Sequence, residues 1–171
     1  VGEELMVCGC DYPDPKDLEN AGISSNWTID ITRADNKRFL RNLPMEVTIS
    51  FKGKTIKFVH GSPRKINEYL RENSKEAEEV MNDFEADILV CGHTHKPYYK
   101  MYGSKMLVNA GSAGKPKTGS PKANYVVIDL YDNTPKVEIC EVDYAYERVA
   151  KVIEKIGLPQ EFADIIRTGK A

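Results

Sequence analysis

The sequence predicts an α/β protein built from mixed sheets that are covered by helices. Helix-like and strand-like segments alternate in the first half of the chain, and hairpins dominate the second half. A short continuous apolar run at 87–91 is typical of a strand buried on both faces. The 171 residues are enough for one domain with a sizeable core.

Three hairpins are expected from alternating apolar and polar residues. They cover residues 46–60, 98–112 and 123–142. In the first hairpin, Val47, Ile49 and Phe51 alternate with polar residues before the turn sequence "KGK". The second hairpin turns at Gly103, and the third turns at the sequence "DN" of residues 132–133.

Helices are expected before, between and after the hairpins. Residues 32–44 form a short helix that Pro44 ends, and residues 74–86 form a helix with Ser74 as its N-cap. A helix at 143–155 carries Val149, Val152, Ile153 and Ile156 as its apolar stripe, and a last short helix surrounds Phe162. Residues 1–26 contain two prolines and several glycines without sustained periodicity and are predicted to be mostly loop.

These segments predict one domain over residues 1–171 with three parts. Residues 1–45 form a loop and helical cap-like segment, residues 46–142 form the sheet core with the functional loops, and residues 143–171 form C-terminal helices.

Composition excludes several classes of protein. Lys and Arg number 24 against 26 Asp and Glu, so the formal charge of −2 shows no basic excess that would argue for nucleic-acid binding. No apolar run is long enough to span a membrane, and no secretory signal pattern is visible. Cys8 and Cys10 are too close for an easy disulfide, and Cys91 and Cys140 lie in apolar runs, which indicates reduced thiols and a cytoplasmic location.

Three histidines are the strongest functional signal. His60 follows the second strand of the first hairpin, and His93 and His95 follow the apolar run at 87–91. The chain has no other histidine. Ligands of open α/β sheets bind beyond the carboxyl ends of strands, where all three would lie. Neutral imidazole is a common ligand of transition metals, so the histidines are either one metal site or three separate hydrogen-bonded side chains.

The local sequence favours a shared site. Gly61 and Gly92 permit sharp turns next to the histidines. In an extended segment residues i and i+2 point the same way, so His93 and His95 can face one crevice while Thr94 faces away.

The segments "FVHGSP" and "CGHTHKP" resemble the fourth and fifth motifs of the calcineurin-like metallophosphoesterases. The following "VNAGSAGKPK" is similar to a glycine-rich loop of the bacterial and archaeal branch, which "CGCDYPDP" and residues 27–70 also resemble. The resemblance implies a four-layer α/β/β/α sandwich of mixed sheets.

It also implies a phosphodiesterase or phosphatase with two divalent metal ions, roughly 3.5–4 Å apart. By motif, His60 and His93 would bind one ion and His95 the other, which makes His93 and His95 the catalytic residues. Mn, Fe, Zn and Ni remain open as the metal. The expected partner is a phosphate-ester small molecule or a nucleotide, with no membrane.

The sequence also departs from the family. The motifs Asp-x-His, Gly-Asp-x-x-Asp and Gly-Asn-His-Asp do not occur, although two divalent ions need carboxylates that three neutral imidazoles cannot replace. Asp11 and Asp14 have no preceding strand to present them. We therefore expect the chain to be the C-terminal part of a longer phosphoesterase. Truncation would expose an apolar sheet edge, so a homo-oligomer is a further expectation.

Phosphate recognition is expected from the loops that carry the histidines. Ser62 and Arg64 follow His60, and Lys115 lies in the glycine-rich loop. Arg can hold phosphate with two hydrogen bonds, and glycine-rich amide clusters hold anions. The same residues could instead be solvated charges and turn residues.

Two other functions stay open beside hydrolysis. The fold could serve as an inactive scaffold or protein-binding module, which the missing carboxylate motifs favour and the three histidines disfavour. It could also bind one metal ion through three histidines. A Cys8–Cys10 zinc site is a weaker idea because the chain has no second cysteine pair.

Overall fold

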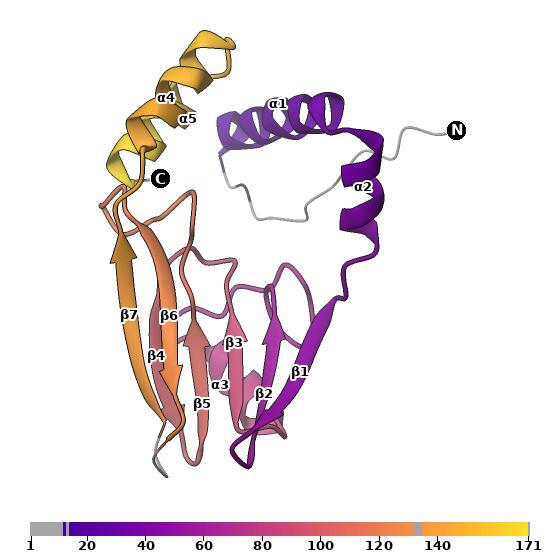
Figure 1. Ribbon diagram of the computed structural model, residues 1–171, viewed down its shortest axis with the longest axis vertical. Coiled ribbons are helices and arrows are strands. Elements are labelled where there is room, and N and C mark those ends of the chain that lie inside the picture. Colours follow the sequence, from indigo (N-terminus) through magenta and orange to yellow (C-terminus); the bar gives the residue numbers. More distant parts are fainter. Residues whose placement is uncertain (1–11, 13, 132–134, 171) are drawn as a thin grey trace.

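The computed structural model describes residues 12, 14–131 and 135–170. This part of the chain forms a five-stranded sheet, a two-stranded sheet and five helices (Figure 1). In chain order the elements are α1 (Pro15–Ile31), α2 (Ala34–Arg41), β1 (Glu46–Phe51), β2 (Lys54–Val59), α3 (Lys75–Asp83), β3 (Ile88–Cys91), β4 (Tyr98–Tyr102), β5 (Lys105–Asn109), β6 (Ala123–Asp129), β7 (Lys136–Val142), α4 (Tyr146–Lys155) and α5 (Gln160–Thr168).

The five-stranded sheet is mixed, as the sequence predicts. Its order is β1-β2-β3-β5-β4, and the neighbours β2, β3 and β5 run parallel. The edge strands β1 and β4 are antiparallel hairpin partners of β2 and β5. The carboxyl ends of three adjacent strands therefore meet at one edge of the sheet, which is where α/β proteins place their sites.

Two apolar clusters cover the two faces of this sheet. On one face, α3 and the segment before it pack on the sheet through buried residues that include Leu70, Met81, Leu89 and Leu107. On the other face, β6 and β7 pack over a second cluster, which contains Ile56, Ile88, Met106, Val108 and Leu130. The described residues thus show a helix layer, the mixed sheet and a second sheet, while the fourth layer stays a prediction.

The predicted hairpins and the helix α3 are confirmed. Glu46 pairs with Val59 and Phe51 with Lys54, so Lys52 and Gly53 of "KGK" make the first turn. The Ser74 side chain accepts a hydrogen bond from the Ala77 amide at 3.2 Å, which is the expected N-cap. The predicted turn at residues 132–133 lies outside the described residues.

The prediction of loop over most of residues 1–26 is wrong from Pro15 onward, because α1 occupies 17 residues there. The Asp14 side chain accepts a hydrogen bond from the Lys16 amide at 2.8 Å, and Pro15 stands at the first helical position. A proline there begins a helix because its missing N–H would have no partner in any case. Pro15, one of the residues that indicated a loop, therefore marks the start of a helix.

The apolar stripe of the helix α4 is only partly buried. Val149, Val152 and Ile156 remain 41%, 49% and 42% exposed, whereas Ala150 is fully buried. The helices α4 and α5 pack on each other and lie beyond the end of the two-stranded sheet (Figure 1). The apolar periodicity predicts the helix correctly, but it does not say what covers the stripe. Among the described residues, no helix has the length and apolar character needed to cross a bilayer.

Candidate metal centre at the strand ends

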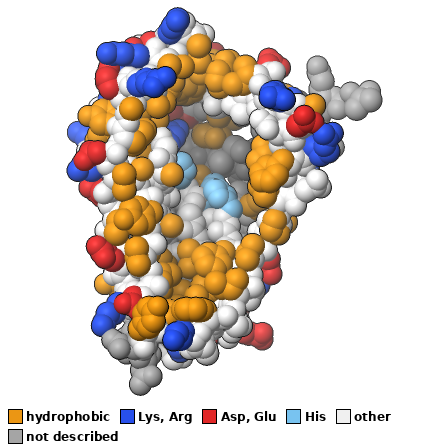
Figure 2. All heavy atoms as spheres, in the orientation of Figure 1, with side chains coloured by type: hydrophobic (Ala, Val, Ile, Leu, Met, Phe, Trp, Pro, Cys, Tyr) orange, Lys and Arg blue, Asp and Glu red, His pale blue; other side chains and the backbone are white. Residues whose placement is uncertain are grey.

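The histidines lie at the carboxyl ends of neighbouring parallel strands. His60 directly follows β2, and His93 and His95 belong to the loop after β3. In the space-filling view, histidine side chains lie in a hollow whose rim carries many apolar side chains (Figure 2). The strand-end placement that the sequence predicts is therefore present in the fold.

His60 and His93 face each other. The Nε2 atom of His60 is 3.1 Å from the Nδ1 atom of His93, and the two rings meet edge to face with centroids 5.0 Å apart. Two nitrogens that bind one zinc-like ion at about 2.0–2.1 Å lie roughly 3 Å apart. The separation therefore fits two ligands of one ion, and in the absence of an ion it fits a shared proton.

The backbone that presents His93 and His95 is not extended, so the predicted alternation around Thr94 is wrong. His93 and His95 have φ angles of 61° and 60°, in the left-handed region. Side chains with a Cβ adopt this region rarely, and histidine is among the residues enriched there. The left-handed residues are the histidines themselves and not Gly92.

His95 has a fixed ring orientation. Its Nδ1 atom donates a hydrogen bond to the carbonyl oxygen of Lys115 at 2.6 Å, so Nδ1 carries the proton and Nε2 keeps its lone pair. Metal-binding histidines commonly donate their second N–H to a backbone carbonyl in this way. The contact joins the loop after β3 to the glycine-rich loop.

Burial and neighbouring positive groups favour the neutral form of His93 and His95. Burial lowers the pKa of His93, and the neighbouring His60 lowers this pKa further, although the Asn67 backbone opposes the shift. Burial also lowers the pKa of His95, and Lys117 and Lys115 add to that effect, although the bond to the Lys115 carbonyl opposes it. Neutral imidazole is the form that binds metals. The two lysines also place positive charge where an anion would enter.

The loop after β2 is folded tightly against itself. A Cβ on Gly61 would lie 2.4 Å from the Ile66 carbonyl oxygen, so only glycine fits there. The buried Ser62 hydroxyl accepts from the amides of Arg64 and Lys65, each at 3.0 Å, and donates to the Glu68 carboxylate. Ser62 therefore holds the loop, and its predicted contact with substrate stays a prediction.

Arg64 points into an acidic pair. Its guanidinium donates to Glu68 from Nε at 3.1 Å and from Nη2 at 2.7 Å, and it reaches Glu79 at 3.4 Å. The hydrogen bond to Glu68 is the main reason that the pKa of Arg64 is raised and the pKa of Glu68 is lowered. A phosphate would have to compete with these carboxylates, so the substrate role of Arg64 also stays a prediction.

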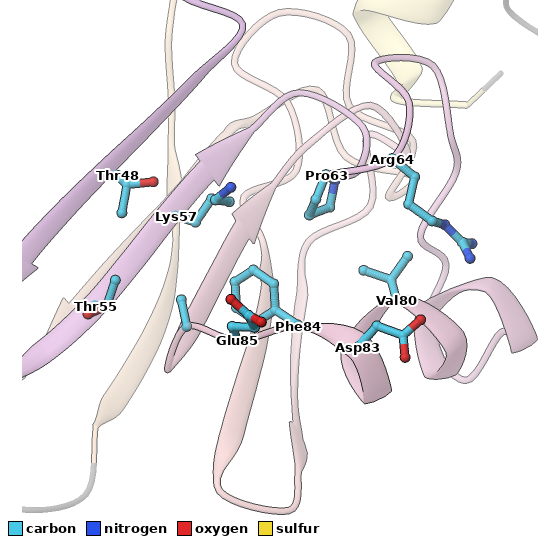
Figure 3. A pocket seen from close by; sticks show the side chains of 10 residues that line it. Thr48, Thr55, Lys57, Pro63, Arg64, Val80, Asp83, Phe84 and Glu85 are labelled. Atoms are coloured by element: carbon cyan, nitrogen blue, oxygen red, sulfur yellow. The ribbon is translucent and has the colours of Figure 1, made fainter.

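A cavity of about 620 Å³ lies elsewhere, between the hairpin β1–β2 and α3 (Figure 3). Thr48, Thr55, Lys57 and Phe84 contribute to its walls, and no histidine does. Its positively charged side chains are already in ion pairs. Lys57 pairs with Glu46 at 2.9 Å, and Arg64 pairs with Glu68 and Glu79. The chemistry-bearing side chains therefore lie at the strand ends and not in this cavity.

Asn109 is a site residue that the sequence analysis missed. It is fully buried at the end of β5, opposite Cys91. Its Nδ2 atom donates to the Gly92 carbonyl at 2.8 Å, and its Oδ1 atom accepts from the Gly111 amide at 3.0 Å. It thereby joins the histidine loop to the glycine-rich loop. A polar residue directly after the apolar run "MLV" is the signal that could have found it.

Replacing Asn109 with leucine is expected to lower the free energy of unfolding by about 1–3 kcal/mol, because the half-buried Gly111 amide and the Gly92 carbonyl both lose their hydrogen-bond partner. Urea denaturation measures this loss. Leucine at the exposed Asn82 on α3 is the matched control and should change stability by less than about 0.5 kcal/mol. Equal effects of the two substitutions would contradict the bridging role of Asn109.

The donor set is incomplete within the described residues. Over residues 12, 14–131 and 135–170, no group of three or more His, Cys, Asp or Glu side chains is arranged to hold a metal ion. Asp11, Cys8 and Cys10 lie outside the described residues, and Asp14 caps α1. Cys91 and Cys140 are free thiols, and burial raises the pKa of Cys91 to about 12. The histidine donors therefore fit a metal, but the described residues do not complete its ligands.

The fold and the loops define an α/β protein with a candidate metal site at its strand ends. The chain matches the calcineurin-like phosphoesterase superfamily domain over residues 4–133. An uncharacterized protein of Methanocaldococcus jannaschii is 30% identical over 161 residues, which cover 84% of this chain and 64% of that protein. The chain belongs to the calcineurin-like phosphoesterase superfamily.

Two solved structures share the fold. A metallophosphoesterase from Sphaerobacter thermophilus has a TM-score of 0.73 and 24% identity, over 85% of this chain and 65% of that chain. A hypothetical protein from Pyrococcus horikoshii has a TM-score of 0.78 and 24% identity, over 94% of this chain and 67% of that chain. At this identity the likeness concerns the fold alone.

The extent of these matches bears on the expected truncation. The chain spans 64% of the length of the Methanocaldococcus protein and 65% of the Sphaerobacter chain. The family match begins at residue 4, however, and gives no support to the expectation that the chain is a C-terminal part lacking the first three motifs. Because the chain spans less than two thirds of these relatives, the activity and substrate of the whole protein are stated below as proposals.

Proposed function

We propose that this chain supplies the histidine ligands of a metal centre that hydrolyses phosphate esters. The observation that carries the proposal is the pair His60 and His93, whose facing nitrogens are 3.1 Å apart at the ends of two parallel strands. The superfamily supports the reaction class, because its members are phosphoesterases that typically bind metals.

Each histidine has one role in this proposal. His60 Nε2 and His93 Nδ1 hold one divalent ion, and His95 holds a second through Nε2, because Nδ1 is already bonded to the Lys115 carbonyl. When bound, the two ions would neutralise charge on the phosphoryl oxygens and lower the pKa of a bound water. Lys115 and Lys117 attract the anionic ester into the hollow.

The alternative is a protein-binding module without catalysis. One observation favours it, namely that no group of three or more metal-ligating side chains exists within the described residues. Under this alternative the histidines share a proton and hold the loops together. The choice between the two functions can be made by measuring metal content and turnover together.

The test is elemental analysis of the protein after incubation with Mn²⁺, combined with hydrolysis of bis-p-nitrophenyl phosphate and p-nitrophenyl phosphate. The proposal predicts about two ions per chain and turnover. His60→Gln and His95→Gln should each lose one ion and the activity, because they remove ligands of different ions. No metal and no turnover would overturn the proposal for this chain, and one ion without turnover would support the mononuclear site.

A further inference from the structure

A chain of ring contacts leads from the surface to the histidine pair. The ring centroid of Tyr69 lies 4.1 Å from that of His93, with 35° between the ring planes. His93 then meets His60 edge to face. The guanidinium carbon of Arg71 lies 4.6 Å from the centroid of the Tyr69 ring, within the range of a cation–π contact. Tyr69 is therefore the aromatic neighbour of a candidate metal ligand.

The backbone next to Tyr69 is anchored in the core. Leu70 is fully buried in the cluster under α3, and its carbonyl oxygen accepts a hydrogen bond from the Tyr98 hydroxyl at 2.7 Å. Tyr98 itself is buried on β4. Glu68, on the other side of Tyr69, is held by Arg64 and Ser62. With both neighbours fixed, the Tyr69 ring has little freedom to leave His93.

The contact with Tyr69 restrains the rotation of the His93 ring about its terminal torsion. The terminal torsion of a histidine is broad, so an isolated imidazole can turn either nitrogen toward a given point. A ring that contacts His93 at a tilt of 35°, with the centroids 4.1 Å apart, restricts this rotation. The observed orientation is the one in which His93 Nδ1 faces His60 Nε2. His95 has a hydrogen bond to Lys115 for the same purpose, whereas His93 has the Tyr69 ring beside it in addition to the Asn67 backbone.

We propose that Tyr69 is a positioning residue for His93, which keeps Nδ1 directed at the point that His60 Nε2 also faces. The inference rests on the proposed function in so far as that point is taken up by a metal ion. It goes beyond that function because it assigns ligand orientation to a residue that donates nothing to the metal. The ring, and not the hydroxyl group, makes this contact.

The test compares the full chain with Tyr69→Phe and Tyr69→Leu in two measurements. In the metal-free protein, NMR of the histidine ring protons should show a ring-current shift at His93 that phenylalanine keeps and leucine loses. In a Co²⁺ titration followed by absorption, Tyr69→Leu should weaken the affinity about 10–100-fold, as loss of a ligand's supporting partner does. Tyr69→Phe should bind as the original chain does.

Each result decides a separate question. If Tyr69→Leu keeps the His93 shift, or binds Co²⁺ as tightly as the original chain, the positioning role is wrong. If the original chain binds no Co²⁺, the proposed function fails, and the shift in the metal-free protein still decides whether Tyr69 orients His93. Arg71→Met covers the case in which Tyr69→Leu does not fold. Arg71→Met should reduce the Co²⁺ affinity, but by less than Tyr69→Leu does. An unchanged affinity together with an unchanged ring-current shift at His93 would overturn the positioning role of Tyr69.

Discussion

Replacing His93 with asparagine is expected to lower the affinity for Mn²⁺ or Co²⁺ by at least about 100-fold. Loss of a partner that only supports a ligand typically costs 10–100-fold, and here the ligand itself is lost. Asparagine is chosen because it tolerates the left-handed conformation that His93 adopts at φ 61°. Folding should therefore be nearly unchanged, and the metal affinity can be measured by titration on an intact protein.

The companion substitution His93→Ala distinguishes the effect of losing a metal ligand from the effect of straining the backbone. The left-handed conformation costs alanine about 1 kcal/mol or more in free energy. This variant should therefore lose stability as well as metal affinity. Thermal or urea unfolding of the two variants gives the difference. If His93→Asn bound metal as tightly as the original chain, His93 would not be a ligand, whatever the stability of His93→Ala.

Replacing Leu70 with alanine is expected to lower the free energy of unfolding by about 2–5 kcal/mol, the usual cost of removing a fully buried leucine side chain. Leu70 has no exposed surface and belongs to the cluster between α3 and the sheet. The segment that carries it connects His60 to α3 and has no regular secondary structure over residues 61–73. This side chain therefore helps to anchor a long loop to the core, together with the hydrogen bond from Tyr98 to the Leu70 carbonyl.

Ile66 provides the control for Leu70. It lies in the same segment and is an aliphatic residue of the same size, but it is 51% exposed. Ile66→Ala should change the free energy of unfolding by much less than Leu70→Ala, because little apolar surface is returned to water. Urea denaturation of both variants makes the comparison, and similar losses would show that Leu70 is not the anchor.

Hydrophobic patterning was a good guide to the elements because strands and helices expose different periodicities. The alternation of Val47, Ile49 and Phe51 identified β1, and the Ser74 cap identified α3. Patterning failed for α1, which buries no residue. The start of this helix is marked by the Asp14 cap and by Pro15. Such a helix carries no apolar stripe for the sequence to reveal.

The site could be predicted only in part for a similar reason. His60 and His93 were expected together because each follows a strand, and parallel pairing of β2 with β3 does bring them together. The left-handed turns at His93 and His95 were not expected, since an i, i+2 argument assumes extended backbone. The pairing of Arg64 with Glu68 and Glu79 was also not expected, because Glu79 lies on α3, far along the chain.

The sequence by itself therefore determined the family, the mixed α/β class and the three histidines at strand ends, because motif identity and local periodicity are properties of short segments. Only the tertiary structure decided which nitrogens face each other, that Asn109 joins two loops, and that Tyr69 lies against His93. These contacts form between segments that the strand order brings side by side. They depend on distances and torsions that no spacing along the chain specifies.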